Sequence, residues 1–236
     1  MGIMRRAAKA FGCEILAPED SFAAQKSFKG LLDQENINLI LDIGANVGQF
    51  VRSVRRTGYK ERILSFEPQS SAHAKLVSLA RTDPKWTIAN RTALGDAPGV
   101  VAMHTAANSL SSSILPMLPS HSVAAPDSRY VGTETTQVNR LDDLVSLTAQ
   151  DRVLLKIDVQ GYEKRVLDGA PRILANCRAL IVEMSLLPLY ESQILAQQLW
   201  EFLDKAGFEV WSFEPEFRSP DSGRLLQMDG YFVRRR

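Results

Sequence analysis

Residues 38–50 have the sequence NLILDIGANVGQF, in which an apolar run leads into a turn with two glycines. The run at residues 38–43 is typical of a strand that is buried on both faces. Residues 49–57 then place Phe50, Val51 and Val54 at helical spacing, and Gly58 follows as a helix stop. A buried strand, a glycine-containing turn and a helix in this order predict the first βα unit of a parallel α/β sheet.

The same alternation continues along the chain. Further strands are expected at residues 62–66, 86–94, 100–105, 135–138, 153–158 and 179–183. Helices are expected at 72–81, 141–147, 162–174 and 192–206, the third of them with a bend near Gly169 and Pro171. In the helix at 72–81, we expect Leu76, Leu79 and Ala80 to face inward. Strands at 208–213 and 231–234 have no helix between them, which predicts a final antiparallel pair. The pattern predicts a Rossmann-like α/β fold, with a mostly parallel seven-stranded sheet and helices on both faces.

Two segments differ from this alternation. Residues 1–36 are expected to form an N-terminal helical extension, interrupted at Pro18, ahead of a main domain at residues 37–236. Residues 106–128 are rich in Ser, Ala and Pro, and this segment is too long for a passive connection. We expect residues 106–128 to act as a lid or a binding loop.

The composition narrows the class of protein. The chain has 236 residues, 45% of them hydrophobic, and a net charge of +1, so no overall field attracts nucleic acid or acidic lipid. It has neither a signal-peptide pattern nor an apolar run of membrane-spanning length. We expect a cytoplasmic protein without stable membrane insertion, either a monomer or a homodimer. Cys13 and Cys177 either stay free or form one disulfide, and no Cys/His spacing indicates zinc.

Two acidic residues lie near the glycine-containing turn, one at the end of each of the first two strands. Asp42 ends the first strand, where a carboxylate repels a dinucleotide pyrophosphate but attracts the ammonium group of a methionine moiety. Glu67 ends the second strand, nineteen residues after Gly48, and a carboxylate there can accept hydrogen bonds from both ribose hydroxyls. The turn also lacks the full GxGxxG pattern. These features favour S-adenosylmethionine over NAD, the alternative being a helix-starting turn with a capping acid.

The residues expected at the cofactor come from four segments of the chain. Residues 90–96 follow the third strand, where backbone and apolar groups can contact adenine, and the serine-rich loop at 111–113 can contribute hydroxyls. The full expected set is Asp42, Gly44, Ala45, Asn46, Gly48, Glu67, Pro68, Thr92, Ala93 and Ser112.

A second polar group follows the strand at 153–158. Lys156 and Asp158 are two residues apart and share a face, and Glu163 lies in the first turn of the next helix. These three are the expected catalytic residues. Asp158 is the predicted general base for methyl transfer to an alcohol, although it can also cap the helix or bond to the cofactor.

Glu183 and His121 are the expected acceptor-binding residues. Glu183 ends the fifth strand on the same rim, and His121 lies in the long loop, from which it can approach as the lid closes. Each has a simpler interpretation as a surface polar group. A Mg²⁺ site built from Asp158, Glu163 and Glu183 is a further alternative, but no motif requires a metal.

The sequence resembles the FkbM-type methyltransferases over about residues 37–185. The matching segments are residues 41–50, 65–68, Asn90 with 93–96, 140–143, 155–163, and 166–167 with 169–170. The resemblance implies a class I methyltransferase fold and methyl transfer to the oxygen of a small-molecule or glycan acceptor, such as a sugar, a glycolipid or a polyketide-type natural product. One departure is Gln160, where this family usually has Glu. A glutamine cannot act as a base or as a charged metal ligand, so either this position is not catalytic or this member has altered chemistry.

Two other functions compete with this interpretation. The first is a methyltransferase that acts on RNA or on another small molecule. The balanced charge and the Asp158-Val159-Gln160-Gly161 sequence after the fourth strand do not favour RNA. A non-catalytic partner protein that binds S-adenosylmethionine is the second. Such a protein would keep Asp42 and Glu67 but would not need Lys156 and Asp158.

Overall fold

The computed structural model describes residues 28–236. Most of the expected N-terminal extension, with Pro18 and Cys13, lies outside the described residues. Residues 28–34 are helical, and Phe28, Leu31 and Leu32 are buried against the main domain. Within residues 28–236, no helix is both long enough and apolar enough to cross a membrane.

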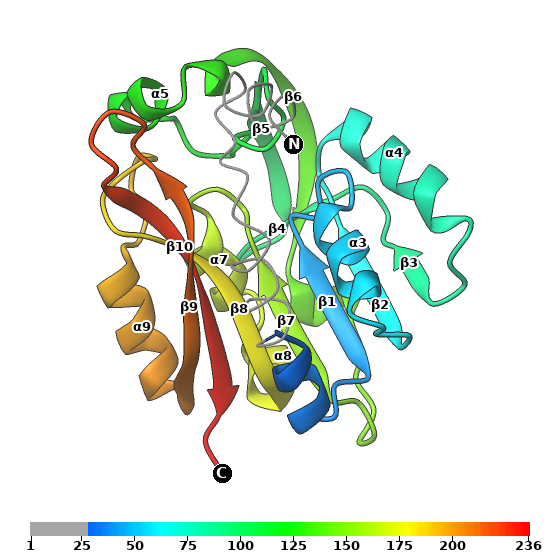
Figure 1. The fold of residues 1–236 in the computed structure, drawn as a ribbon. Helices are drawn as coiled ribbons and strands as arrows, with labels where there is room; N and C mark the ends of the chain where they lie inside the picture. The colour runs from blue at the N-terminus through cyan, green and yellow to red at the C-terminus, as the bar shows by residue number, and fades with distance from the viewer. Residues whose placement is uncertain (1–27) are drawn as a thin grey trace, which may run out of the picture.

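A seven-stranded sheet forms the centre of the molecule (Figure 1). Its strands, in spatial order, are β3 (Trp86–Ile88), β2 (Arg62–Phe66), β1 (Leu39–Ile43), β7 (Val153–Ile157), β8 (Cys177–Ser185), β10 (Leu225–Arg234) and β9 (Phe208–Arg218). Neighbours from β3 to β8 pair in parallel, whereas β10 is antiparallel to both β8 and β9. The predicted mostly parallel seven-stranded sheet and its antiparallel C-terminal pair are confirmed.

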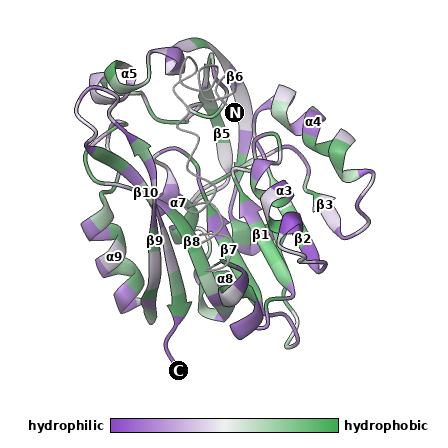
Figure 2. Cartoon of the chain, viewed as in Figure 1, coloured by the Kyte–Doolittle hydropathy of each residue, from purple (hydrophilic) through white to green (hydrophobic). Residues whose placement is uncertain are grey.

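Different helices cover the two faces of the sheet, and alternate residues of each strand pack against one set or the other. Leu41 and Leu155 face the core cluster that includes residues of α6 (Leu141–Leu144), α7 (Glu163–Asp168), α8 (Pro171–Asn176) and α9 (Ala196–Lys205). Ile40 and Leu154 face the cluster formed with residues 28–34, α3 (Gln49–Arg56) and α4 (Ser70–Ala80). Figure 2 shows the apolar character of the central strands and the mixed polarity of α4 and α9. Burial on both faces explains why these strands are continuously apolar.

A second sheet was not predicted. It has three strands, in the order β4 (Ala93–Leu94), β6 (Tyr130–Asn139) and β5 (Gly99–Ala106). The strand expected at residues 86–94 is divided between β3 and β4, which belong to different sheets. Figure 1 shows β5 and β6, together with α5 (Pro119–Ala124), above the carboxyl ends of the parallel strands. The segment at 106–128 contains α5 and a short 3₁₀ turn at Pro126–Ser128, so it is partly structured.

Two helix predictions need refinement. The helix expected at 162–174, with a bend near Gly169 and Pro171, is interrupted at these residues and forms two helices, α7 and α8. A Cβ on Gly169 would lie 1.9 Å from the carbonyl oxygen of Gly95, so this turn packs tightly against the residue that follows β4. In α4, Leu76 is fully buried, but Leu79 is 41% exposed. Ala72, rather than Leu79, shares the buried face with Leu76.

The order of strands reverses between β1 and β7, and Gly44 lies at this point. It has a left-handed backbone with φ of 79°, and a Cβ on it would lie 1.8 Å from the carbonyl oxygen of Asp158. Only glycine tolerates both the conformation and the close approach. The carboxyl ends of β1 and β7 can therefore meet, and open α/β sheets bind ligands at such a crevice.

Gly44→Ala is expected to reduce the free energy of unfolding by about 3 kcal/mol or more, because strain and a backbone clash add together. Gly58→Ala is the matched control, since Gly58 has a φ of 89° but open space around it, and about 1–2 kcal/mol is expected there. Urea denaturation of both variants measures the difference. Equal losses would contradict the close packing of Gly44 on β7.

Candidate active site

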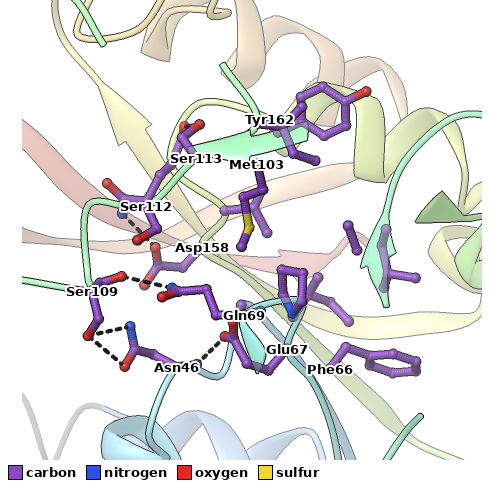
Figure 3. A pocket seen from close by; sticks show the side chains of 18 of the residues that line it. Asn46, Phe66, Glu67, Gln69, Met103, Ser109, Ser112, Ser113, Asp158 and Tyr162 are labelled. Atoms are coloured by element: carbon purple, nitrogen blue, oxygen red, sulfur yellow. Dashed lines mark hydrogen bonds between the residues drawn. The ribbon is translucent and has the colours of Figure 1, made fainter. Parts of the chain in front are cut away.

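A cavity of about 620 Å³, partly open to solvent, lies at the carboxyl ends of β1, β2 and β7 (Figure 3). Its apolar lining includes Phe66, Pro68, Leu94 and Met103, and its polar lining comes from the strand ends and from residues 109–113.

Glu67 is the buried carboxylate of this cavity. Its Oε2 accepts a hydrogen bond from the backbone amide of Asn46 (2.7 Å), and its Oε1 accepts one from the amide of Gln69 (2.7 Å). Burial raises the pKa of Glu67 to about 7, although the two amides oppose this shift. The carboxylate is thus held rigidly, and each oxygen keeps a lone pair for a ligand.

Residues 109–113 form one wall of the cavity. The Ser109 carbonyl accepts a hydrogen bond from Nε2 of Gln69 (2.9 Å), and its hydroxyl lies 3.4 Å from the Asn46 side chain, as Figure 3 shows. The Ser112 hydroxyl does not bond to the glycine-containing turn. It accepts a hydrogen bond from the backbone amide of Ala106 (2.9 Å). The position of this segment agrees with the binding loop expected at 106–128, and it ties the loop to the glycine-containing turn.

Asp42 and Lys156 form a buried pair beside the cavity rather than in its wall. The two residues are register partners on β1 and β7, and the Lys156 Nζ lies 3.7 Å from Oδ1 of Asp42 and 3.2 Å from Oδ2 of Asp158. The Ser65 hydroxyl donates to Oδ2 of Asp42 (2.8 Å), while Oδ1 of Asp42 has no hydrogen-bond partner among residues 28–236. Burial lowers the pKa of Lys156, but Asp158 and Asp42 outweigh it and hold this pKa above its usual range. Burial raises the pKa of Asp42.

Glu163 holds the loop between β7 and α7. Its Oε1 accepts hydrogen bonds from the backbone amides of Val159 (3.2 Å) and Gly161 (3.0 Å), and the side chain does not line the cavity. Burial raises the pKa of Glu163 to about 7. The carboxylate thereby fixes the segment that carries Asp158 and Gln160.

Gln160 connects the carboxylates of Asp158 and Glu183. Its Nε2 donates to Oδ1 of Asp158 (2.9 Å) and to both carboxylate oxygens of Glu183 (3.1 and 3.0 Å). Its Oε1 accepts a hydrogen bond from the hydroxyl of the fully buried Tyr190 (2.8 Å). Burial, followed by the nearby Asp158, raises the pKa of Glu183 well above its ordinary value.

His121 lies outside the cavity, in α5. Its ring packs against Tyr190 (centroids 5.1 Å apart) and Phe217 (5.4 Å), and its Nδ1 has no hydrogen-bond partner. Burial lowers the pKa of His121 to about 4, so the ring is neutral at physiological pH.

The structure brings part of the predicted set together at the cavity. The predicted residues that line it are Gly44, Asn46, Glu67, Pro68, Thr92, Ala93, Ser112 and Asp158. Those that do not line it are Asp42, Ala45, Gly48, Lys156, Glu163, Glu183 and His121. Sequence reasoning missed Gln69, Met103 and Ser109 as cavity residues and Tyr190 as a partner of Gln160. Only Ser109 had a usable signal, because it lies in the expected binding loop.

No group of three or more His, Cys, Asp or Glu side chains within residues 28–236 is arranged to hold a metal ion. The Mg²⁺ alternative proposed Asp158, Glu163 and Glu183 as ligands. In the structure, Glu163 bonds to backbone amides, and an amide nitrogen separates Asp158 from Glu183.

Comparisons with known proteins agree with this architecture. The sequence profile of the methyltransferase FkbM domain matches residues 42–210. The 2-O-methyltransferase NoeI of Sinorhizobium fredii is 26% identical over 197 residues, covering 80% of each chain. The 1,6-didemethyltoxoflavin-N1-methyltransferase of Burkholderia thailandensis superposes with a TM-score of 0.51 at 12% identity, over 91% of this chain and 79% of that one. Methyltransferase FkbM from Methylobacillus flagellatus gives 0.48 at 14% identity over 82% of this chain, which spans 43% of its length.

The sheet order and the likeness in fold define a class I methyltransferase fold. The profile covers more than half of the sequence, and the chain belongs to the FkbM methyltransferase family. The predicted family, enzyme class and cofactor are confirmed.

Proposed function

We propose that this enzyme transfers the methyl group of S-adenosylmethionine to a hydroxyl of a small acceptor, such as a sugar, a glycolipid or a polyketide-type natural product. The observation that carries the proposal is the position of Asp158. Its carboxylate lines the cavity at the strand crossover and is 36% exposed, and a lysine and a glutamine hold it from two sides. The relative NoeI is a 2-O-methyltransferase, which supports an oxygen acceptor.

The cavity residues fit the cofactor. Glu67 offers free lone pairs to two ribose hydroxyls, and Phe66, Pro68 and Leu94 provide an apolar surface for adenine. Gly44 leaves backbone space beside them. Oδ1 of Asp42 is buried beside the cavity, 3.7 Å from the Lys156 Nζ, so we propose that Asp42 attracts the ammonium group of the cofactor at a distance or through water. When bound, S-adenosylmethionine supplies the activated methyl group.

Asp158 is the proposed general base. Its Oδ1 accepts from Gln160 and its Oδ2 from Lys156, and each oxygen has a second lone pair for the proton of an acceptor hydroxyl. Lys156 stays protonated and acts as a fixed partner that orients the carboxylate. Glu163 is proposed to act at one remove, by fixing the backbone from Val159 to Gly161.

The charge on the acceptor side favours a neutral or cationic acceptor over RNA. Carboxylates of Asp158, Glu183, Glu216 and Asp229 influence one another there, and Lys156 is the cation that opposes them. The residues that line the cavity include no Lys or Arg, whereas nucleic-acid sites usually carry clustered Lys and Arg. We infer a neutral, polyhydroxylated acceptor whose hydroxyls bond to carboxylate and amide groups.

The experiment is a screen with methyl-labelled S-adenosylmethionine, using deoxysugar glycosides, glycolipid extracts and total RNA, each with and without EDTA. We expect label in a sugar or natural-product hydroxyl as a methyl ether that survives mild alkali. Label confined to RNA, to amines or to alkali-labile esters would contradict the proposal. The EDTA arm measures whether turnover needs a divalent metal.

A further inference from the structure

We propose that Gln160 is a positioning residue, whose side-chain amide holds the Asp158 and Glu183 carboxylates together at the acceptor side of the site. The inference rests on the proposed function, since it gives Gln160 a part in the same reaction. One amide nitrogen lies within 3.1 Å of oxygens from both carboxylates. An amide donor can bridge two acids in the way that a cation otherwise does.

The backbone at Gln160 is fixed from both sides. Its φ is 56°, a left-handed value that is unusual for a residue with a side chain, and Gly161 continues the turn with φ of 98°. The Gln160 carbonyl accepts from the hydroxyl of Ser113 (2.7 Å), and Glu163 accepts from the amides on either side. An unfavourable conformation that its surroundings hold in place is common at functional sites.

The end of the Gln160 side chain is also oriented. The Tyr190 hydroxyl donates to Oε1 of Gln160, and the amide nitrogen faces the two carboxylates. Tyr190 is fully buried, and its hydroxyl also lies 3.3 Å from the carbonyl of Ser111. The amide is thus held between the binding loop and the two acids, with its oxygen toward Tyr190 and its nitrogen toward Asp158 and Glu183.

The effect of residue 160 on the two acids depends on its being a neutral amide. A neutral donor stabilises the ionised forms of both acids, whereas a third carboxylate at the same place would repel them. The charged and titratable groups that face the two acids are Lys156 from β7, Asp42 from β1, Glu163 from α7, Tyr190 after β8, Glu216 from β9 and Asp229 from β10. Most of these are acidic, so the loss of the one amide donor is poorly compensated.

The test compares Gln160→Glu, Gln160→Ala and Tyr190→Phe with the wild-type full chain. Using an acceptor from the screen, we expect kcat to fall at least about tenfold in both Gln160 variants, while the cofactor affinity stays within about twofold. In Gln160→Glu, the acid limb of the pH profile of kcat should move up by about one unit, and Mn²⁺ should partly restore kcat by bridging three carboxylates. Tyr190→Phe should change kcat in the same direction by a smaller factor.

A second readout does not depend on turnover. Carbon-13 NMR of the side-chain carboxyl groups should show Glu183 titrating at higher pH in Gln160→Ala, and more so in Gln160→Glu. Titration with Mn²⁺ alone, followed by electron paramagnetic resonance, should detect a bound ion in Gln160→Glu and not in the wild type. Unchanged pH profiles and unchanged Glu183 titration in both variants would overturn the positioning role. Failure to find an acceptor would count against the proposed function and leave these two measurements intact.

Discussion

Asp158→Asn is expected to lower kcat by about 10²- to 10⁴-fold while cofactor affinity remains close to that of the wild type. Asparagine keeps the shape of the side chain and can still accept a hydrogen bond from Lys156, but it cannot take up a proton. Asp158 lines the cavity with 36% of its side chain exposed, whereas Glu183 does not line it. Calorimetry with S-adenosylmethionine and a labelled-methyl assay with the identified acceptor measure the two quantities separately.

The matched control for Asp158→Asn is Asp143→Asn. Asp143 lies in α6, which precedes β7, is exposed and does not line the cavity, so kcat should be unchanged. A loss of cofactor affinity equal to the loss of kcat would move Asp158 to the cofactor site. Normal turnover in Asp158→Asn combined with its loss in Glu183→Gln would identify Glu183 as the base.

Glu67→Gln is expected to weaken the binding of S-adenosylmethionine by about 100-fold. Hydrogen bonds to a charged group contribute about 1.5–3 kcal/mol each, and each 1.4 kcal/mol corresponds to a factor of ten in affinity. In the variant, the side-chain NH₂ group also faces one of the two backbone N–H donors, so one of the two hydrogen bonds that the wild-type carboxylate accepts is lost. Calorimetry gives the affinity, and circular dichroism checks that the fold is kept.

The affinity of the wild type should depend on pH through Glu67. Burial raises the pKa of Glu67 to about 7, and hydroxyl donors from a ribose favour the ionised form. Cofactor affinity should therefore fall as the pH drops below about 7 and level off above it, with a proton released on binding at neutral pH. Because the folded-state pKa lies above the unfolded value, this group stabilises the cofactor-free fold in acid, and the contribution is lost as the pH rises through about 7.

Glu61→Gln is the control for Glu67→Gln. Glu61 is exposed, immediately before the amino-terminal end of β2, so affinity and its pH dependence should match the wild type. Wild-type affinity in Glu67→Gln, or a pH dependence that survives in it, would remove Glu67 from the cofactor site. Asp42→Ala is a less specific test, because removing one partner of a buried ion pair costs about 3–5 kcal/mol of stability by itself.

The sequence by itself determined the order of strands and helices, the glycine-containing turn after β1 and the carboxylate after β2. These features depend on local patterns: buried strands are continuously apolar, and residues at the ends of parallel strands meet at one edge of the sheet. The match at residues 155–163 also indicated the family. Glu67 and Asp158 could therefore be placed at the cavity from their positions alone.

Only the tertiary structure decided which way each polar side chain points. Asp42 was expected at the cofactor, but its register partners Ser65 and Lys156 draw it into a buried network beside the cavity. Gln160 was noted as a departure from the family, yet its bonds to Glu183 and Tyr190 join residues 23 and 30 positions away. Such contacts arise from the packing of β7, β8 and the segment after β8, and no local pattern encodes a hydrogen bond between residues that far apart.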